Sequence, residues 1–157
     1  MAPRITIENR QRTLKIPTQR LRTMAVTVLD ALGCPDSELA VTIVGDRSIR
    51  TLNRQYLGKD RPTNVISFAM NEGECSGLNP EVLGDVVISA ATAAREAAEG
   101  ELLFVERLSF LLLHGILHLV GYDHERSGPE EAVRMEEKER ELFDLLRMNG
   151  YLEEPRA

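Results

Sequence analysis

The chain has 157 residues, of which 43% are hydrophobic and 28% are charged, and its formal net charge is −6. This size and composition are typical of an ordinary globular protein, so we expect a single domain over residues 1–157 with one sizeable core. The longest apolar stretch, residues 108–120, is too short to span a bilayer, and residues 1–12 lack the apolar region of a signal peptide. We therefore expect a cytoplasmic protein with no membrane partner.

Hydrophobic periodicity predicts a series of strands and helices along the chain. In chain order they are a strand at residues 4–9, a helix from Thr18 to a stop at Gly33, a strand at 38–45, a helix from Asp46 to Tyr56, strands at 64–70 and 81–89, and helices at about 90–100, 102–120 and 129–148. This order predicts an α/β (α+β) fold with a small, mixed, four-stranded sheet covered by helices.

Side-chain chemistry indicates several helix ends and faces. Asp46 and Ser89 are suitable N-caps for the helices that follow them. In the helix after Asp46, the spacing of Ile49, Leu52 and Tyr56 predicts that these three side chains form its buried face.

Charge is distributed unevenly along the chain. Residues 1–61 carry eleven Lys and Arg against six Asp and Glu, whereas residues 62–157 carry eight against nineteen. A basic half is compatible with a polyanionic partner, although solvated faces explain the asymmetry more simply. Residues 136–141, EEKERE, are interpreted as one such solvated face. The two cysteines, Cys34 and Cys75, form no CxxC pair, so we expect neither a structural disulfide nor a cysteine-based zinc site.

All three histidines of the chain lie in one short segment, HGILHLVGYDH. His114 and His118 are four residues apart on a predicted helix, so both imidazoles lie on one face and can share a metal ion. Gly121 ends that helix, and a sharp turn can return His124 to the same point. Three neutral imidazoles on zinc leave one coordination position for a water whose pKa falls to about 7. A single histidine on an apolar face is usually an ordinary core residue, but three in this arrangement favour a metal site.

The same histidine spacing occurs in a class of zinc peptidases, but with a difference. Those proteins carry Glu directly after the first histidine as the general base, and this chain has Gly115 there. A glycine accepts no proton, so peptide hydrolysis by that route is disfavoured. We expect the small residue to leave room beside the metal. Asp123 and Glu125 flank the third histidine, where each has either a ligand-orienting role or a turn role.

Three segments together resemble the YbeY family of bacterial metal-dependent endoribonucleases. They are HGILHLVGYDH (114–124), LNRQYLGKDRPTNVISF (52–68) and LGDVVIS (83–89), and the resemblance extends over about residues 38–150. It implies a compact α/β domain with a zincin-like metal helix packed on a small mixed sheet. It also implies that His114, His118 and His124 bind the metal. The substrate would be single-stranded RNA, notably the 3′ end of the small-subunit ribosomal RNA, and the partners would include the small ribosomal subunit and its proteins.

One departure from the family pattern concerns the second segment. Family members commonly have an arginine after the tyrosine, which is taken to serve catalysis or RNA contact, whereas this chain has Leu57. Leucine cannot bind phosphate, so we expect Lys59 or Arg61 on the same loop to supply the cation. No catalytic residue beyond the metal centre is indicated, and the nucleophile, either a water or the RNA 2′-hydroxyl, stays open.

The sequence therefore supports three functions. The first is a zinc-dependent, single-strand-specific endoribonuclease in ribosomal RNA maturation and ribosome quality control. The second is a non-catalytic ribosome-assembly factor with a structural metal, which Leu57 and the missing glutamate favour. The third is a metallohydrolase on another substrate such as a peptide, against which Gly115 argues. Zinc is the expected cofactor, one ion per chain, although nickel or copper suits the same ligands.

Overall fold

The computed structural model describes residues 3–70, 82–122 and 128–154. The strands are β1 (Arg4–Asn9), β2 (Glu38–Val44), β3 (Val65–Ala69) and β4 (Val82–Ser89), and the helices are α1 (Thr18–Ala31), α2 (Asp46–Leu57), α3 (Ala90–Glu99), α4 (Phe104–Leu119) and α5 (Pro129–Met148). The bounds differ from the predicted ones by two residues at most, because the hydrophobic periodicity and the Gly and Pro positions define most element ends.

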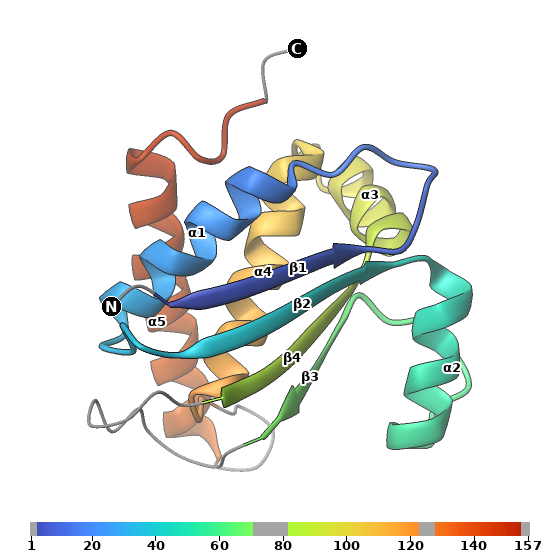
Figure 1. The fold of residues 1–157 in the computed structure, drawn as a ribbon, viewed down its shortest axis with the longest axis horizontal. Coiled ribbons are helices and arrows are strands. Elements are labelled where there is room, and N and C mark those ends of the chain that lie inside the picture. Colours follow the sequence, from blue (N-terminus) through green and yellow to red (C-terminus); the bar gives the residue numbers. More distant parts are fainter. Residues whose placement is uncertain (1–2, 71–81, 123–127, 155–157) are drawn as a thin grey trace.

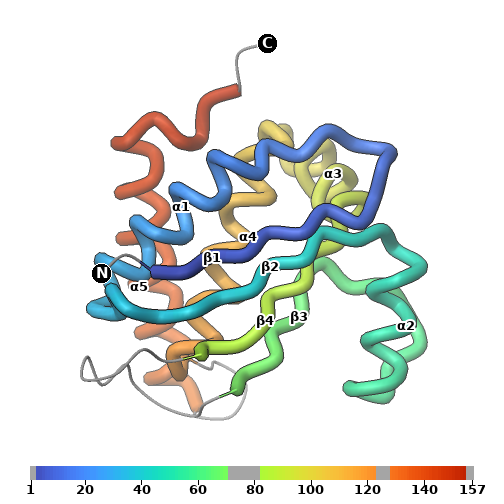
Figure 2. Tube along the Cα trace, viewed as in Figure 1, coloured from blue at the N-terminus to red at the C-terminus, as the bar shows by residue number. Residues whose placement is uncertain are grey.

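The four strands form one mixed sheet in the order β1-β2-β4-β3. β1 pairs with β2 and β2 pairs with β4 in parallel, whereas β3 runs antiparallel to β4. Figure 1 shows this sheet with α1, α4 and α5 on one side and α2 on the other, and the trace in Figure 2 follows the same order. The predicted fold class, a mixed four-stranded sheet with helices, is confirmed.

The two faces of the sheet carry different apolar clusters. Successive side chains of a strand point to opposite faces, so Val86 and Ile88 of β4 join the main core with α1, α4 and α5, whereas Val87 lies in a smaller cluster with Ile49 of α2. The main core is the larger because α1, α3, α4 and α5 all contribute residues to it. The histidines of α4 therefore belong to one side of the sheet, and α2 belongs to the other.

The starts of α2 and α3 share a polar network. Ser89 caps α3 as predicted, since its side-chain oxygen accepts the Thr92 N–H at 3.2 Å. Asp46 does not cap α2, contrary to prediction, because Gly45 occupies the N-cap position and Asp46 is the first helical residue. Its carboxylate instead accepts hydrogen bonds from Ser89 and Thr92 at 2.6 Å and from Arg95 at 2.7 Å. The network ties the start of α2 to the start of α3.

The predicted inner face of α2 is only partly correct. Ile49 is fully buried and Leu52 is half-buried, but Tyr56 is 64% exposed. Asn53 is buried instead, and its side-chain amide donates to the backbone oxygen of Arg61 at 2.9 Å. A buried amide needs such a partner, and this one fixes the loop that follows α2.

Two further expectations concern membrane-spanning helices and the two cysteines. Among the described helices, none by itself has the length and apolar character of a membrane span, and only α3 and α4 taken together reach it, with a bend of 118° between them. The expectation that the cysteines form no structural disulfide is wrong for Cys34, which is disulfide-bonded. The spacing rule behind that expectation considers residues close in sequence and carries no information on distant pairs. The other cysteine, Cys75, lies outside the described residues.

Candidate functional site

The candidate site lies on α4, which is buried along most of its length. Most of its apolar side chains belong to the main core, and only a few residues, among them His114 and His118, are half-buried. Nothing in the helical pattern of a core helix requires histidine. The two imidazoles therefore lie where the apolar helix reaches the border of the core.

Gly115 sets how closely α4 approaches the sheet. A Cβ atom at this position would lie 2.7 Å from Val86 Cγ1 and 3.2 Å from Ser67 Oγ. The Ser67 hydroxyl also donates to the Gly115 backbone oxygen at 3.0 Å. The expectation that Gly115 leaves room beside a metal is wrong, since β3 and β4 fill that space. The glycine serves close helix–sheet contact instead.

The two imidazoles of α4 point their outer nitrogens at one another. His114 Nε2 and His118 Nε2 are 3.0 Å apart, and the ring centroids are 4.6 Å apart with the planes at 75°. Two nitrogens on a tetrahedral zinc ion at about 2.0–2.1 Å lie roughly 3.4 Å from each other. The observed separation needs only a small opening to accept an ion, so this pair fits two ligands of one metal.

The end of α4 has the turn that the sequence predicts. The Tyr122 N–H donates to the Leu117 oxygen at 3.0 Å, and the Gly121 N–H donates to the His118 oxygen at 3.2 Å. With Gly121 at φ +104°, these bonds form a Schellman motif, which ends the helix at Gly121. The motif stabilises the turn of helix that carries His118.

His124, the third predicted ligand, lies outside the described residues, as do Asp123 and Glu125. Within the described residues, no group of three or more His, Cys, Asp or Glu side chains converges on one point. Of the predicted ligands, the structure thus brings His114 and His118 together.

A carboxylate that sequence reasoning missed completes the described part of the site. Glu139 of α5 lies in the segment 136–141 that was interpreted as a solvated face, yet it is only 8% exposed. Its Oε1 lies 2.7 Å from His114 Nδ1. The interpretation as solvated is therefore wrong for Glu139. Its spacing from Met135 and Leu142, which are also buried, is the signal that could have found it.

The His114 ring has further neighbours on α4. The Phe110 ring stacks beside it with centroids 6.1 Å apart and the planes at 24°, and the Arg107 guanidinium lies 5.2 Å from the Phe110 centroid. Arg107 pairs with Glu96 of α3 at 3.0 Å, and Glu96 also accepts the side-chain amide of Asn64. This row of contacts holds the imidazole between α3 and α5.

The loop that carries Lys59 and Arg61 follows α2. Both side chains are exposed, and Leu57 at the end of α2 is 55% exposed. The loop backbone is fixed by Gly58 at φ +70° and by the hydrogen bond from Lys59 N–H to the Asn53 oxygen at 3.2 Å. The loop is thus anchored to α2, while the described contacts of His114 lead to α5 and to His118.

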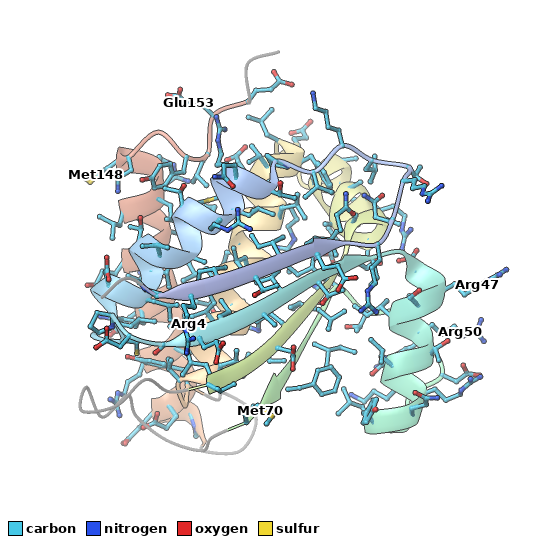
Figure 3. All side chains as sticks on the ribbon, viewed as in Figure 1. Arg4, Arg47, Arg50, Met70, Met148 and Glu153 are labelled. Atoms are coloured by element: carbon cyan, nitrogen blue, oxygen red, sulfur yellow. The ribbon has the colours of Figure 1, made fainter. Side chains whose placement is uncertain are left out.

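A second charged pair involves the same loop. Arg50, which Figure 3 shows projecting outward from α2, pairs with Asp60 at 2.9 Å between Nε and Oδ1. The hydrogen bond from Arg50 holds the pKa of the Asp60 carboxyl below its usual value. Arg50 thus balances the charge of Asp60. Lys59 and Arg61, which flank Asp60, are not needed to balance it.

A pocket of about 640 Å³ lies on the α2 side of the sheet. Its lining includes Asp85 and Val87 of β4, Phe68 of β3 and Arg47 of α2. Val87 points away from Val86, which contacts Gly115 of the histidine helix. This pocket is therefore separate from the imidazole pair, and the sheet lies between them.

Fold and site together define a class of protein: a mixed α/β domain in which a buried helix with the pattern His-x-x-x-His packs on the sheet through a glycine. Comparison with known proteins gives the family. The family model described as Endoribonuclease YbeY matches residues 6–147, and the chain belongs to that family.

Relatives of high identity support this assignment. The chain is 65% identical to the Endoribonuclease YbeY of Geobacter sulfurreducens over 94% of this chain and 98% of the relative. It is 57% identical to the Endoribonuclease YbeY of Syntrophotalea carbinolica over 91% and 95% of the two chains. The solution structure of TM1509 from Thermotoga maritima has the same fold, with a TM-score of 0.63, 23% identity and 98% of each chain covered.

Proposed function

We propose that this chain is a metal-dependent, single-strand-specific endoribonuclease that acts in ribosomal RNA 3′-end maturation and ribosome quality control. The observation that carries the proposal is the 3.0 Å approach of the His114 and His118 Nε2 atoms. It supports a metal ion in a chain whose family and curated relatives bear the name Endoribonuclease YbeY. The substrate is single-stranded ribosomal RNA, and the partners are the small ribosomal subunit and its proteins, in the cytoplasm.

In this proposal His114, His118 and His124 hold one zinc ion, and nickel suits the same imidazoles. Zinc, when bound, supplies Lewis acidity at a phosphate oxygen and a lowered pKa for a bound water. The described residues contribute position: Gly115 seats α4 against β3 and β4, and the Gly121 turn fixes the end of the helix. Lys59 and Arg61 bind RNA phosphates, because both are exposed on an anchored loop. Asp60, which lies between them, is paired with Arg50 instead.

The test is cleavage of a single-stranded RNA whose sequence is the 3′ end of small-subunit ribosomal RNA. We expect the zinc-loaded wild type to cut it, and His118→Ala or a chelator to abolish cleavage while circular dichroism shows a folded protein. The same RNA annealed to its complement should resist. The endoribonuclease proposal fails if the zinc-loaded wild type leaves the single strand intact.

One observation favours a second function, that of a non-catalytic assembly factor with a structural metal. Leu57 is exposed at the end of α2, where the resemblance would place an arginine. If zinc-loaded protein binds small ribosomal subunits without cutting RNA, this second function holds. A peptidase is disfavoured, because Gly115 cannot act as a base and faces the sheet.

A further inference from the structure

Glu139 is an unusual residue for its position on α5. It is 8% exposed and shares the inner face of the helix with Met135, Leu142 and Leu146, all of which are buried. Burying a carboxylate is costly unless it is hydrogen-bonded. In this structure its Oε1 lies 2.7 Å from His114 Nδ1. Its place in the helix is thus explained by the imidazole it meets on α4.

This contact determines which nitrogen of His114 carries the proton. A carboxylate can only accept a hydrogen bond, so the proton of a neutral His114 ring resides on Nδ1. The lone pair is then on Nε2, which is the atom that lies 3.0 Å from His118 Nε2. The orientation suits metal binding, because a metal requires an unprotonated nitrogen.

The carboxylate also fixes the direction of the ring. Phe110 stacks at 24° beside His114 and restricts its tilt, but stacking alone permits the ring to turn over about its own axis. A half-turn about the Cβ–Cγ bond would put Cδ2 in the place of Nδ1 and lose the bond to Glu139. The combination of one stacked neighbour and one acceptor leaves a single orientation with Nε2 toward His118.

We propose that Glu139 is a positioning residue, which holds His114 in its Nδ1–H tautomer with Nε2 directed at the metal. This inference rests on the proposed function, since it assumes that His114 and His118 share an ion. Carboxylates behind metal-binding histidines strengthen metal affinity by about 10- to 100-fold. A purely structural role, joining α5 to α4, would affect stability without changing the tautomer.

The first measurement uses the metal-free full-length protein, with ¹⁵N-labelled histidine and NMR detection of the tautomer of each ring. We expect the wild type to show His114 protonated on Nδ1. Glu139→Gln keeps the size and an acceptor oxygen and should largely retain this tautomer, whereas Glu139→Leu should lose it. Glu136→Gln, an exposed position on the same helix, is the matched control and should behave as the wild type.

The second measurement is zinc affinity, by competition with a chromogenic chelator. We expect Glu139→Leu to weaken zinc binding by at least tenfold, Glu139→Gln to weaken it less, and Glu136→Gln to leave it unchanged. The inference is overturned if the tautomer and the zinc affinity of both Glu139 variants equal those of the wild type. If Glu139→Leu does not fold, Glu139→Ala takes its place, because it also removes the acceptor oxygen, and an unchanged tautomer and zinc affinity in that variant overturn the inference.

A further variant separates the two proposals. His118→Ala should weaken zinc binding in an otherwise intact protein. If wild type and His118→Ala bind zinc equally, the metal centre itself is wrong, and the positioning role is overturned with it. If His118→Ala weakens zinc binding but the Glu139 variants do not, the metal centre stands and only the role of Glu139 is wrong.

Discussion

The Ser67 hydroxyl of β3 donates to the backbone oxygen of Gly115 on α4 at 3.0 Å, so an edge strand is bonded directly to the residue after the first histidine. The contact is possible because no side chain separates the helix from the sheet. Since Val86 Cγ1 would lie 2.7 Å from a Cβ at position 115, a side chain there must move the strand or the helix.

Gly115→Ala should therefore destabilise the protein. In an open helix this substitution gains about 1 kcal/mol, but overpacking against the stiff Val86 side chain costs about 1–3 kcal/mol. We expect a net loss of roughly 1 kcal/mol in urea unfolding, together with weaker zinc binding as α4 shifts. Gly33→Ala, which meets no atom within 4 Å but has φ +77°, is the control for stability loss without a change in zinc affinity. A variant Gly115→Ala as stable as the wild type contradicts the close-contact role.

Asp46 should make stability depend on pH below the neutral range. Burial alone would raise the pKa of its carboxyl, but hydrogen bonds from Ser89, Thr92 and Arg95 outweigh it, so the pKa is lowered. A carboxyl with a lowered pKa in the folded state contributes stability that is fully present above its unfolded value of about 3.9 and is lost as the pH falls through the folded value.

Asp46→Asn tests this. Loss of charge-assisted bonds should cost about 1–3 kcal/mol at pH 7, and the difference from wild type should shrink below about pH 4. Asp60→Asn removes an exposed ion pair with Arg50 and should change stability little, because surface pairs contribute little. A difference for Asp46→Asn that stays constant down to the lowest pH at which both proteins fold would contradict the assignment.

Lys59 and Arg61 should contribute to RNA affinity without affecting the fold. We expect Lys59→Ala and Arg61→Ala each to weaken binding of single-stranded RNA and to lower the slope of log affinity against log salt by about one. Lys15→Ala removes an exposed cation from a different part of the chain and should not change the affinity. If neither loop variant alters RNA binding or cleavage, the loop does not supply the phosphate contact.

Leu57→Arg should strengthen RNA binding. Leu57 is 55% exposed, so an arginine can replace it without burying a charge, and one added phosphate contact should raise the salt slope by about one. Leu57→Gln keeps a polar side chain without the charge and serves as the control. Equal affinity of Leu57→Arg and Leu57→Gln, measured by fluorescence anisotropy at low salt, would show that this position lies away from the RNA.

The parts of the fold that periodicity encodes were predictable, and contacts between distant elements were not. Ser89 as an N-cap and α5 from Pro129 to Met148 follow from local chemistry and are confirmed. Asp46 was misplaced because its partners Ser89 and Thr92 are distant in sequence. Local preference favours aspartate as an N-cap, so the sequence alone predicted the wrong role for Asp46.

The candidate site shows the same division. The spacing of His114 and His118 predicts their shared face, and the structure confirms that they meet. Glu139 could not be paired with His114 from sequence, because helix spacing gives its face and not its neighbour on α4. The role of His124 stays a prediction, since that residue lies outside the described chain.

The position of Glu139 on the last helix also has a consequence for biosynthesis. A ribosome makes a chain from its N-terminus, so both imidazoles of α4 are synthesised before the carboxylate of α5. A nascent chain that ends before Glu139 contains His114 without the group that orients its ring. The arrangement of the two imidazoles is thus completed only once translation has reached the final helix.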